Sequence, residues 1–272
     1  MKKERLDVLL VEKGFYDSRE KAKRNIMAGT VFVEGQRSDK AGMKVDHEAS
    51  IEIKGKALPF VSRGGLKLEK AVEEFGLELR SKTCIDIGSS TGGFTDCMLQ
   101  EGATKVYAID VGYGQLDYKL RKDSRVVVME RTNIRNVTLP DIEEKVDFIS
   151  VDVSFISLKL VLPVAKKLLK DSGSMVVLIK PQFEAGREKV GKNGVIREPK
   201  THKEVLSKVL YFIKEEELGI EQLSFSPIKG PKGNMEFLAF LKNKHTSWDD
   251  KTLETKVQQI VEHAHQSLGK SN

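Results

Sequence analysis

The chain has 272 residues, of which 39% are hydrophobic and 32% are charged, a composition typical of a folded globular protein. Its six excess positive charges and pI near 9.1 favour a polyanionic partner, although many basic proteins bind no nucleic acid. No apolar run approaches the roughly 20 residues of a membrane span, the charged start does not resemble a signal peptide, and two cysteines and five histidines are too few for a disulfide framework or a metal cluster. We therefore expect a cytoplasmic protein with no membrane anchor and no metal.

The beginning of the chain predicts a small α+β domain. Residues 5–28 have the apolar spacing of two short helices, with Ser18 as the N-cap of the second helix and Gly29 just after its end. Residues 30–33 and 49–53 are short apolar segments on either side of a turn and a polar stretch, so they are expected to pair as strands.

Four basic residues crowd the second of these helices: Arg19, Lys21, Lys23 and Arg24. A solvated helix face explains this crowding as well as RNA contact does. The surrounding pattern is more specific, and residues 1–58 resemble the ribosomal-protein S-four RNA-binding domain through Arg5-Leu6-Asp7, Leu9-Leu10, Ser18 to Ala22, Ile26, Gly29, Val31, Val33 and Gly35. The resemblance implies a domain that binds structured RNA, and the candidate contacts are Arg5, Arg19, Lys21, Lys23, Arg24 and Arg63.

Residues 59–272 predict an α/β domain built on a parallel sheet. Short apolar strands alternate with helical stretches at Cys84–Ile87, Val106–Ile109, Val126–Val128, Phe148–Val151 and Met175–Ile179. Two later strands, 223–226 and 237–241, have no room between them for a crossover helix and are expected to form an antiparallel pair at the sheet edge. That ending is characteristic of Rossmann-like methyltransferases and not of nicotinamide enzymes.

The loop after the first of these strands has the features of a cofactor site, because it follows a strand and opens a helix. Asp110 ends the next strand about 20 residues further on, where a carboxylate can accept hydrogen bonds from ribose hydroxyls. An acid at Asp86 suits the cationic amino group of S-adenosylmethionine and would repel a pyrophosphate, so we expect that cofactor and not NAD. The candidate contacts are Asp86, Gly88, Ser89, Ser90, Thr91, Gly92, Gly93, Phe94, Asp110, Asn133 and Asp152.

Purely structural explanations remain open for several of these residues. The three loop glycines could serve only a tight strand-to-helix turn, Phe94 is expected to pack in the core or loop, and Asn133 could cap a turn. The stretch from Gly186 to Gly194, with Arg187, Lys189, Lys192 and Arg197 nearby, suits either phosphate contacts or a plain surface loop.

Four charged residues form the candidate catalytic set. Asp152, Lys180 and Glu236 each belong to segments that apolar strands deliver to one edge of the sheet, and Lys67 precedes the first strand. Over residues 60–241 this order resembles the catalytic tetrad of the FtsJ-like 2′-O-ribose methyltransferases. Our hypothesis is that Lys180 is the general base or orients the ribose hydroxyl, while Asp152, Lys67 and Glu236 fix its position and charge. Taken singly, Lys67 could be a solvated helix residue and Glu236 an ordinary strand-edge charge.

Together with the front domain and the Ser62-Arg63-Gly64-Gly65 junction, this set is similar to the TlyA family over almost the entire chain. The resemblance implies a methyltransferase that modifies cytidine 2′-hydroxyls in ribosomal RNA of the large subunit, and in some members of the small subunit. Ribosomal RNA or a ribosomal subunit is therefore the expected partner. Three rival functions are a catalytically silent ribosome-assembly factor, a haemolysin, and a base methyltransferase. The region of Asp152 has neither an Asn-Pro-Pro-Tyr-type segment nor a nucleophilic cysteine, which speaks against base methylation.

Overall fold

The computed structural model divides into two compact units, Met1–Gly65 and Leu66–Asn272, and each is described by itself. The structure describes residues 3–54, 58–186, 189–191, 193–244 and 248–269. The division falls at the start of the first helix of the larger unit.

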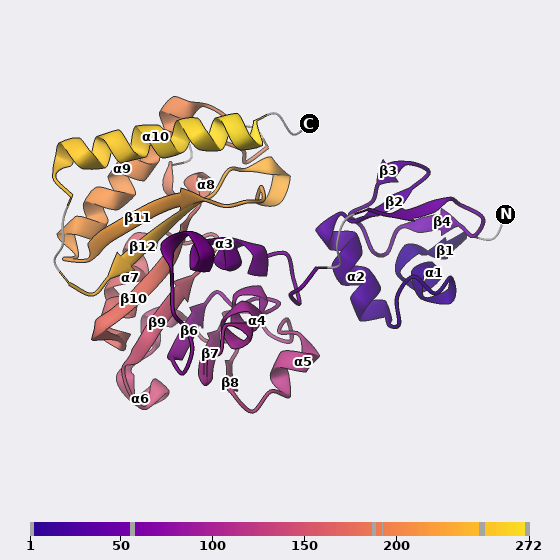
Figure 1. Ribbon diagram of the computed structural model, residues 1–272, viewed down its shortest axis with the longest axis horizontal. Helices are drawn as coiled ribbons and strands as arrows, with labels where there is room; N and C mark the ends of the chain where they lie inside the picture. Colours follow the sequence, from indigo (N-terminus) through magenta and orange to yellow (C-terminus); the bar gives the residue numbers. More distant parts are fainter. Residues whose placement is uncertain (1–2, 55–57, 187–188, 192, 245–247, 270–272) are drawn as a thin grey trace. The chain divides into compact units, whose positions relative to one another are not determined.

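The smaller unit contains two short helices and five very short strands (Figure 1). In chain order these elements are β1 Lys3–Arg5, α1 Leu6–Glu12, α2 Arg19–Ala28, β2 Val31–Val33, β3 Gln36–Arg37, β4 Lys44–Asp46 and β5 Ile51–Ile53. The predicted helix pair and the predicted pairing of β2 with β5 are confirmed, and the structure shows that this pairing is antiparallel. Strands β1, β3 and β4 were not predicted, because they are mostly polar, whereas β2 and β5 are apolar enough to stand out.

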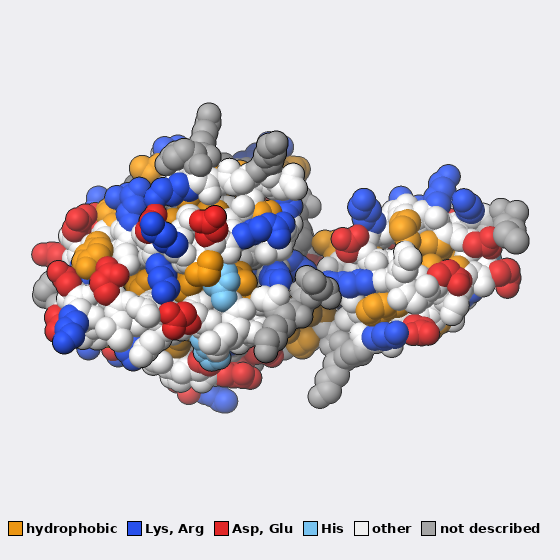
Figure 2. Space-filling view, turned by 90° about the horizontal axis from the view of Figure 1, so that it is seen from above, with side chains coloured by type: hydrophobic (Ala, Val, Ile, Leu, Met, Phe, Trp, Pro, Cys, Tyr) orange, Lys and Arg blue, Asp and Glu red, His pale blue; other side chains and the backbone are white. Residues whose placement is uncertain are grey.

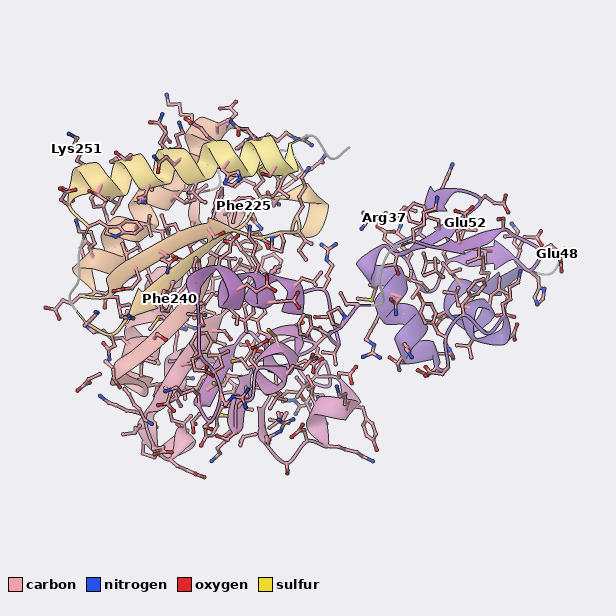
Figure 3. All side chains as sticks on the ribbon, viewed as in Figure 1. Arg37, Glu48, Glu52, Phe225, Phe240 and Lys251 are labelled. Carbon is pink, nitrogen blue, oxygen red and sulfur yellow. The ribbon has the colours of Figure 1, made fainter. Side chains whose placement is uncertain are left out.

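Local signals set the limits of α2. The Ser18 hydroxyl accepts a hydrogen bond from the backbone N–H of Lys21 at 3.3 Å, which caps the helix start. Gly29 ends the helix with φ +76°, a conformation that disfavours other residues, and the guanidinium of Arg37, labelled in Figure 3, occupies the place of a side chain there. The two helices then bury a small core that includes Leu6, Leu9 and Ile26.

The larger unit is a seven-stranded sheet flanked by helices (Figure 1). Its strands are β6 Thr83–Ile87, β7 Lys105–Ile109, β8 Val126–Met129, β9 Val146–Val151, β10 Leu169–Ile179, β11 Gly219–Phe225 and β12 Phe237–Lys242. Its helices are α3 Gly65–Phe75, α4 Gly93–Gln100, α5 Tyr118–Arg121, α6 Leu139–Ile142, α7 Leu162–Leu168, α8 Pro181–Glu184, α9 Pro199–Glu215 and α10 Asp250–Leu268. Short 3-10 turns occur at Ile134–Asn136, Leu158–Leu160 and Pro231–Gly233.

The strand order is β11-β12-β10-β9-β6-β7-β8, with β12 antiparallel to both of its neighbours and the β10-β9-β6-β7-β8 pairs parallel. The predicted antiparallel pairing of the last two strands is confirmed. The prediction that both strands lie at the sheet edge is corrected. Of the two, only β11 is an edge strand, because β12 is inserted between β11 and β10. This insertion buries β12 between two strands, which explains why its apolar run is continuous.

Both faces of the sheet are covered. On one face, alternate strand residues such as Ile85 and Val177 form a core with α7, α9 and α10. Helix α10 runs beside α9 along the β11 end of the sheet (Figure 1). On the other face, Phe240 of β12 stacks on Phe75 of α3 with ring centroids 5.7 Å apart (Figure 3). Buried on both faces, the central strands hold their carboxyl ends in fixed relative positions.

Charges of both signs are interspersed on the surface of the larger unit that Figure 2 shows. Among the described residues, no helix is long and apolar enough to cross a membrane. No group of three or more His, Cys, Asp or Glu side chains in the described ranges could hold a metal ion.

Candidate active site

A cavity of about 470 Å³ opens at the carboxyl ends of β6, β7 and β9. Its walls combine apolar side chains with a few polar groups, the usual make-up of a small-molecule site. The polar lining includes Ser90, Asp110, Gln115, Asn133 and Asp152. Four of these five were predicted cofactor contacts, and Gln115 was missed because nothing in its local sequence marks it.

The backbone at Gly88 passes unusually close to the strand-end residue Asp152. A Cβ atom at Gly88 would lie 2.5 Å from the Asp152 carbonyl oxygen, and φ at Gly88 is +85°. Both facts require glycine at this position. Gly88 thereby lets β6 and the end of β9 lie close together at the wall of the cavity.

The Asp110 carboxylate is held rigidly at the cavity wall. It accepts hydrogen bonds from the backbone N–H of Ser90 at 2.8 Å and of Gly112 at 2.7 Å. The Ser90 hydroxyl also donates to the amide oxygen of Gln115 at 3.3 Å. These contacts leave Asp110 positioned at the strand end, where ribose hydroxyls are commonly bound.

Asp86 does not line the cavity. Its carboxylate is buried and accepts hydrogen bonds from Thr95 Oγ1 at 2.7 Å and Ser150 Oγ at 3.0 Å, so it ties β6 to α4 and β9. Burial raises the pKa of Asp86 to about 7, against the lowering effect of the two hydroxyls. Asp86, on which the expectation of S-adenosylmethionine partly rested, therefore has a clear structural role beneath the cavity.

Several other predicted cofactor residues shape the loop and stay outside the cavity lining. Gly92 has φ +93°, and a Cβ atom there would lie 2.2 Å from Leu120 Cδ1. Phe94 is buried, as expected for a packing residue. Ser89, Thr91 and Gly93 are likewise absent from the lining. Asn133 does line the cavity, and its Oδ1 also accepts a hydrogen bond from the Arg135 backbone N–H at 3.1 Å, which is the turn-capping role.

The four candidate catalytic residues form one continuous chain of alternating charge. Lys67 Nζ lies 2.7 Å from Glu236 Oε2 and 3.4 Å from Asp152 Oδ2, and Lys180 Nζ pairs with the other oxygen of Asp152. All four side chains are buried or nearly so, with 17% of Asp152 exposed. Lys67 and Glu236 are therefore neither a solvated helix charge nor an ordinary strand-edge charge.

The environment fixes the charge of Lys67 and Asp152. Burial disfavours the Lys67 ammonium, but the carboxylates of Asp152 and Glu236 outweigh it and raise the pKa of Lys67. Burial likewise opposes ionisation of Asp152, and the two lysines outweigh it and lower the pKa of Asp152. Lys67 is thus a fixed cation and Asp152 a fixed anion.

Two residues of this network were missed from the sequence. Lys180 Nζ donates a hydrogen bond to Ser154 Oγ at 3.0 Å. Gly230 faces the carboxyl group of Glu236, and a Cβ atom there would lie 2.1 Å from Glu236 Oε1. Neither residue carries a local signal, because each matters only through a side chain distant in the sequence.

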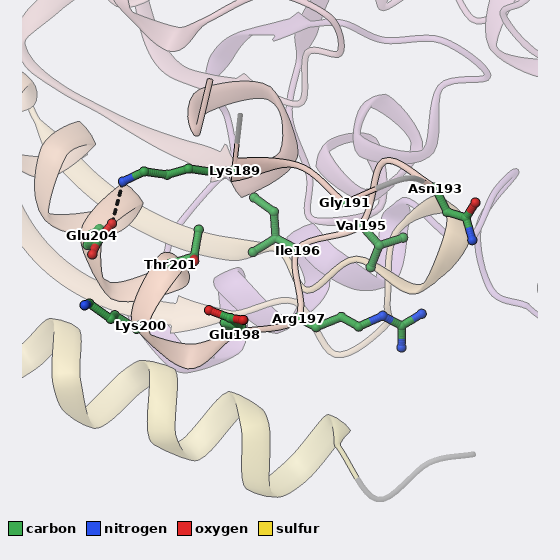
Figure 4. A pocket seen from close by; sticks show the side chains of 10 residues that line it. All are labelled: Lys189, Gly191, Asn193, Val195, Ile196, Arg197, Glu198, Lys200, Thr201 and Glu204. Atoms are coloured by element: carbon green, nitrogen blue, oxygen red, sulfur yellow. Dashed lines mark hydrogen bonds and ion pairs between the residues drawn. The ribbon is translucent and has the colours of Figure 1, made fainter. Parts of the chain in front are cut away.

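A second cavity of about 640 Å³ lies where the chain leads into α9 (Figure 4). Its charged lining is mixed, with Lys189, Arg197 and Lys200 against Glu198 and Glu204. Lys189 Nζ pairs with Glu204 at one end, while Arg197 extends at the other (Figure 4). The predicted basic residues Arg187 and Lys192 lie outside the described residues.

In the smaller unit, two predicted RNA-binding residues converge on a buried carboxylate. Asp7 pairs with Arg5 Nε at 2.9 Å and with Arg19 Nη2 at 2.9 Å. The hydrogen bond from Arg5 is the main reason that the pKa of Asp7 falls to about 2, and Arg19 adds to it against the opposing effect of burial. Both guanidinium groups are therefore oriented on the surface of this unit.

The other predicted cations of α2 have acidic neighbours. Lys21 Nζ lies 3.0 Å from Asp17 and Lys23 Nζ lies 2.7 Å from Glu20. Arg24 is partly exposed on the same helix, and Arg63 is partly exposed just before α3. Exposed ion pairs of this kind are weak and can exchange partners with a phosphate.

Comparison with known proteins shows which families the two units resemble. The family model described as FtsJ-like methyltransferase matches residues 60–243, and the S4 domain model matches residues 4–51. A Mycobacterium tuberculosis relative named "16S/23S rRNA (cytidine-2'-O)-methyltransferase TlyA" is 40% identical over 88% of this chain and 90% of its own length. This chain belongs to the TlyA family of FtsJ-like methyltransferases.

Other relatives extend the TlyA likeness over nearly the whole chain. The YqxC protein of Bacillus subtilis is 53% identical over 98% of this TlyA-family chain and 96% of its own length. A Brachyspira hyodysenteriae protein named "Hemolysin A" is 44% identical over 86% of this chain and 98% of its own. A solved structure from Streptococcus thermophilus is 48% identical, covers 99% of this chain and 98% of its own, and has a TM-score of 0.79.

Proposed function

We propose that this methyltransferase transfers a methyl group from S-adenosylmethionine to the 2′-hydroxyl of cytidine in ribosomal RNA, in the cytoplasm where ribosomes are made. The observation that carries the proposal is the buried Lys180–Asp152–Lys67–Glu236 chain beside a cavity at the strand ends. The relative from Mycobacterium tuberculosis that carries this activity in its name supports the choice of substrate.

The cavity fits the cofactor in size and chemistry. Its volume of about 470 Å³ falls in the range of small-molecule sites. Asp110 offers acceptors for ribose hydroxyls, Ile109 and Ile134 offer apolar contacts for the adenine ring, and Asn133 offers a polar group at its edge. Gly88 allows the ligand to approach the backbone closely. When bound, S-adenosylmethionine supplies an electrophilic methyl group.

The network prepares the acceptor. A ribose hydroxyl is a poor nucleophile, so it must be oriented and must release its proton as its oxygen receives the methyl group. Lys67 is held as a cation by two carboxylates, whereas Lys180 contacts one carboxylate and one neutral hydroxyl. We assign charge stabilisation to Lys67. Lys180 Nζ is assigned to orient the 2′-hydroxyl and, in the neutral form that it reaches by first releasing its own proton to solvent, to accept the hydroxyl proton as the ribose oxygen takes the methyl group and the methyl–sulfur bond of the cofactor breaks. Asp152 and Glu236 keep the two lysines in place.

RNA binding is assigned first to the smaller unit. Asp7 holds the guanidinium groups of Arg5 and Arg19 in a fixed orientation, and their remaining N–H groups suit phosphate oxygens. Lys21, Lys23, Arg24 and Arg63 add positive charge, and Arg197 does so in the larger unit. Phosphate contacts of this kind make binding weaken as salt rises.

The test is methyl transfer from labelled S-adenosylmethionine to ribosomal subunits that lack the modification. Wild type should label RNA, and Lys180→Ala should be slower by about two to four powers of ten while binding the cofactor with unchanged affinity in calorimetry. Lys251→Ala on α10, an exposed lysine labelled in Figure 3, is the matched control and should behave as wild type. If neither wild type nor variant labels RNA while both bind the cofactor, the protein is instead a catalytically silent assembly factor.

A further inference from the structure

The partners of Lys180 come from one short stretch of chain. Lys180 Nζ pairs with the carboxylate of Asp152 and donates a hydrogen bond to Ser154 Oγ at 3.0 Å. Asp152 and Ser154 are two residues apart, and the intervening Val153 is partly buried against the hydrophobic core. Just after the end of β9 at Val151, both polar side chains thus reach the same amine.

This stretch is anchored at both ends, although Ser154 itself is exposed at the cavity. At the first end, the Asp152 backbone N–H donates to the Ile87 carbonyl at 2.9 Å. At the second end, Glu184 of α8 accepts hydrogen bonds from Ser157 Oγ at 2.7 Å and from the Leu158 backbone N–H at 2.8 Å. Hydrogen bonds thus fix the chain on both sides of Ser154, and the Ser154 hydroxyl itself is bound to Lys180 Nζ.

A hydroxyl and a carboxylate hold a lysine in different ways. A carboxylate can only accept hydrogen bonds. It therefore binds the charged ammonium form of lysine best, and its interaction weakens once the lysine has lost a proton. A hydroxyl oxygen accepts from an N–H of the ammonium and equally from an N–H of the neutral amine, which leaves the single amine lone pair free for the proton of the ribose hydroxyl. The hydrogen bond to Ser154 depends less on the charge of the amine than the pair with Asp152 does, so Ser154 can keep Lys180 Nζ in position in both protonation states.

We propose that Ser154 is a positioning residue that keeps Lys180 Nζ aligned on the acceptor hydroxyl while the proton moves. The inference rests on the proposed function, because alignment of Lys180 matters only if that lysine serves the ribose. It makes Ser154 a contributor to the rate of transfer and not to the binding of either ligand.

The test compares two isosteric variants of the full chain, Ser154→Thr and Ser154→Val, together with Ser154→Ala. Threonine retains the hydroxyl and should keep kcat within about threefold of wild type, whereas valine and alanine should lower kcat by about 10- to 100-fold, the usual effect of losing one orienting hydrogen bond to a charged group. KM for the ribosomal subunit and Kd for S-adenosylmethionine should stay within about twofold in all three. Ser207→Ala on α9, whose hydroxyl bonds Glu254 at the surface, is the control for serine loss and should leave kcat unchanged.

The outcomes separate this inference from the proposed function. If wild type methylates ribose and Lys180→Ala does not, but Ser154→Val is as fast as Ser154→Thr, only the role of Ser154 is overturned. It is also overturned if Ser154→Val and Ser154→Ala raise KM or Kd and leave kcat unchanged. If wild type itself fails to methylate RNA, the proposed function is refuted and this inference with it.

Discussion

At the residue scale, the buried charges among the described residues differ in whether an opposite charge compensates them. The lysines Lys67 and Lys180 pair with the carboxylates of Asp152 and Glu236. Asp86 accepts hydrogen bonds from the hydroxyls of Thr95 and Ser150 and from the Thr95 backbone N–H, which are all neutral groups, so its ionisation is costly. Its pKa of about 7 means that the carboxyl group is partly protonated near neutral pH.

This cost predicts a pH-dependent effect of Asp86→Asn. The pKa of Asp86 is higher in the folded state than in the unfolded state. Its contribution to the free energy of unfolding is therefore most favourable below about pH 4. That contribution falls by at most about 4 kcal/mol as the pH rises through about 7. Asparagine stays neutral, so the variant should gain stability relative to wild type between pH 5 and pH 8. The free energy of unfolding in urea at both pH values measures this. The same pH dependence in both proteins would contradict the assignment.

Gly230 predicts a second effect at this scale. In Gly230→Ala the new methyl group would lie 2.1 Å from Glu236 Oε1, and both residues are buried, so Glu236 must shift away from Lys67. We expect a loss of stability of about 1–3 kcal/mol and a fall in kcat of at least about 10-fold. Gly76→Ala, where the added methyl meets open space, is the control and should keep kcat. A fully active Gly230→Ala would show that Glu236 need not hold Lys67.

At the element scale, α1 and α2 of the S4 domain are joined by the pair of Asp7 with Arg19, in addition to their apolar contacts. The carboxylate is fully buried while both arginines are about half exposed. Solvent therefore screens part of the attraction, and the pair is worth less than its pKa alone indicates.

Asp7→Asn should destabilise this helix pair by about 1–2 kcal/mol at pH 7. Because the folded pKa of Asp7 is depressed to about 2, the contribution is present above about pH 4 and disappears as pH falls through about 2. Amide hydrogen exchange in the full chain should speed up in α1 and α2 at pH 7. Asp17→Asn, which removes an exposed pair with Lys21, should leave exchange unchanged. Equal exchange in both variants would show that the buried pair does not hold the helices.

The elements that the sequence predicted are those with a strong periodic signal. Strands such as β9 and β10 are buried on both faces and appear as apolar runs, and the cap at Ser18 has a residue type suited to its role. The positions of Asp152, Lys180 and Glu236 beside apolar strands predicted that these three residues share one edge of the sheet. The partners within the catalytic set were not predictable, since Lys67 contacts Glu236 across 169 positions of sequence. Ser154 and Gly230 had no signal, because their importance lies in a neighbour that only folding supplies.

At the scale of the whole molecule, recognition and chemistry are assigned to different units. The S4 domain carries the oriented arginine pair, and the FtsJ-like domain carries the cavity and the buried lysines. The net charge of +6 favours association with RNA without specifying a sequence. On the proposed function, target choice depends on which RNA places a ribose hydroxyl at Lys180.

The central claim is that the methyl group reaches a ribose oxygen, and identification of the product nucleoside tests it most directly. Ribosomal subunits lacking the modification would be treated with the full chain and labelled S-adenosylmethionine, and their RNA digested to nucleosides and analysed by mass spectrometry. The account predicts label in 2′-O-methylcytidine, formed about two to four powers of ten more slowly by Lys180→Ala. Label on a base instead of a ribose would contradict it.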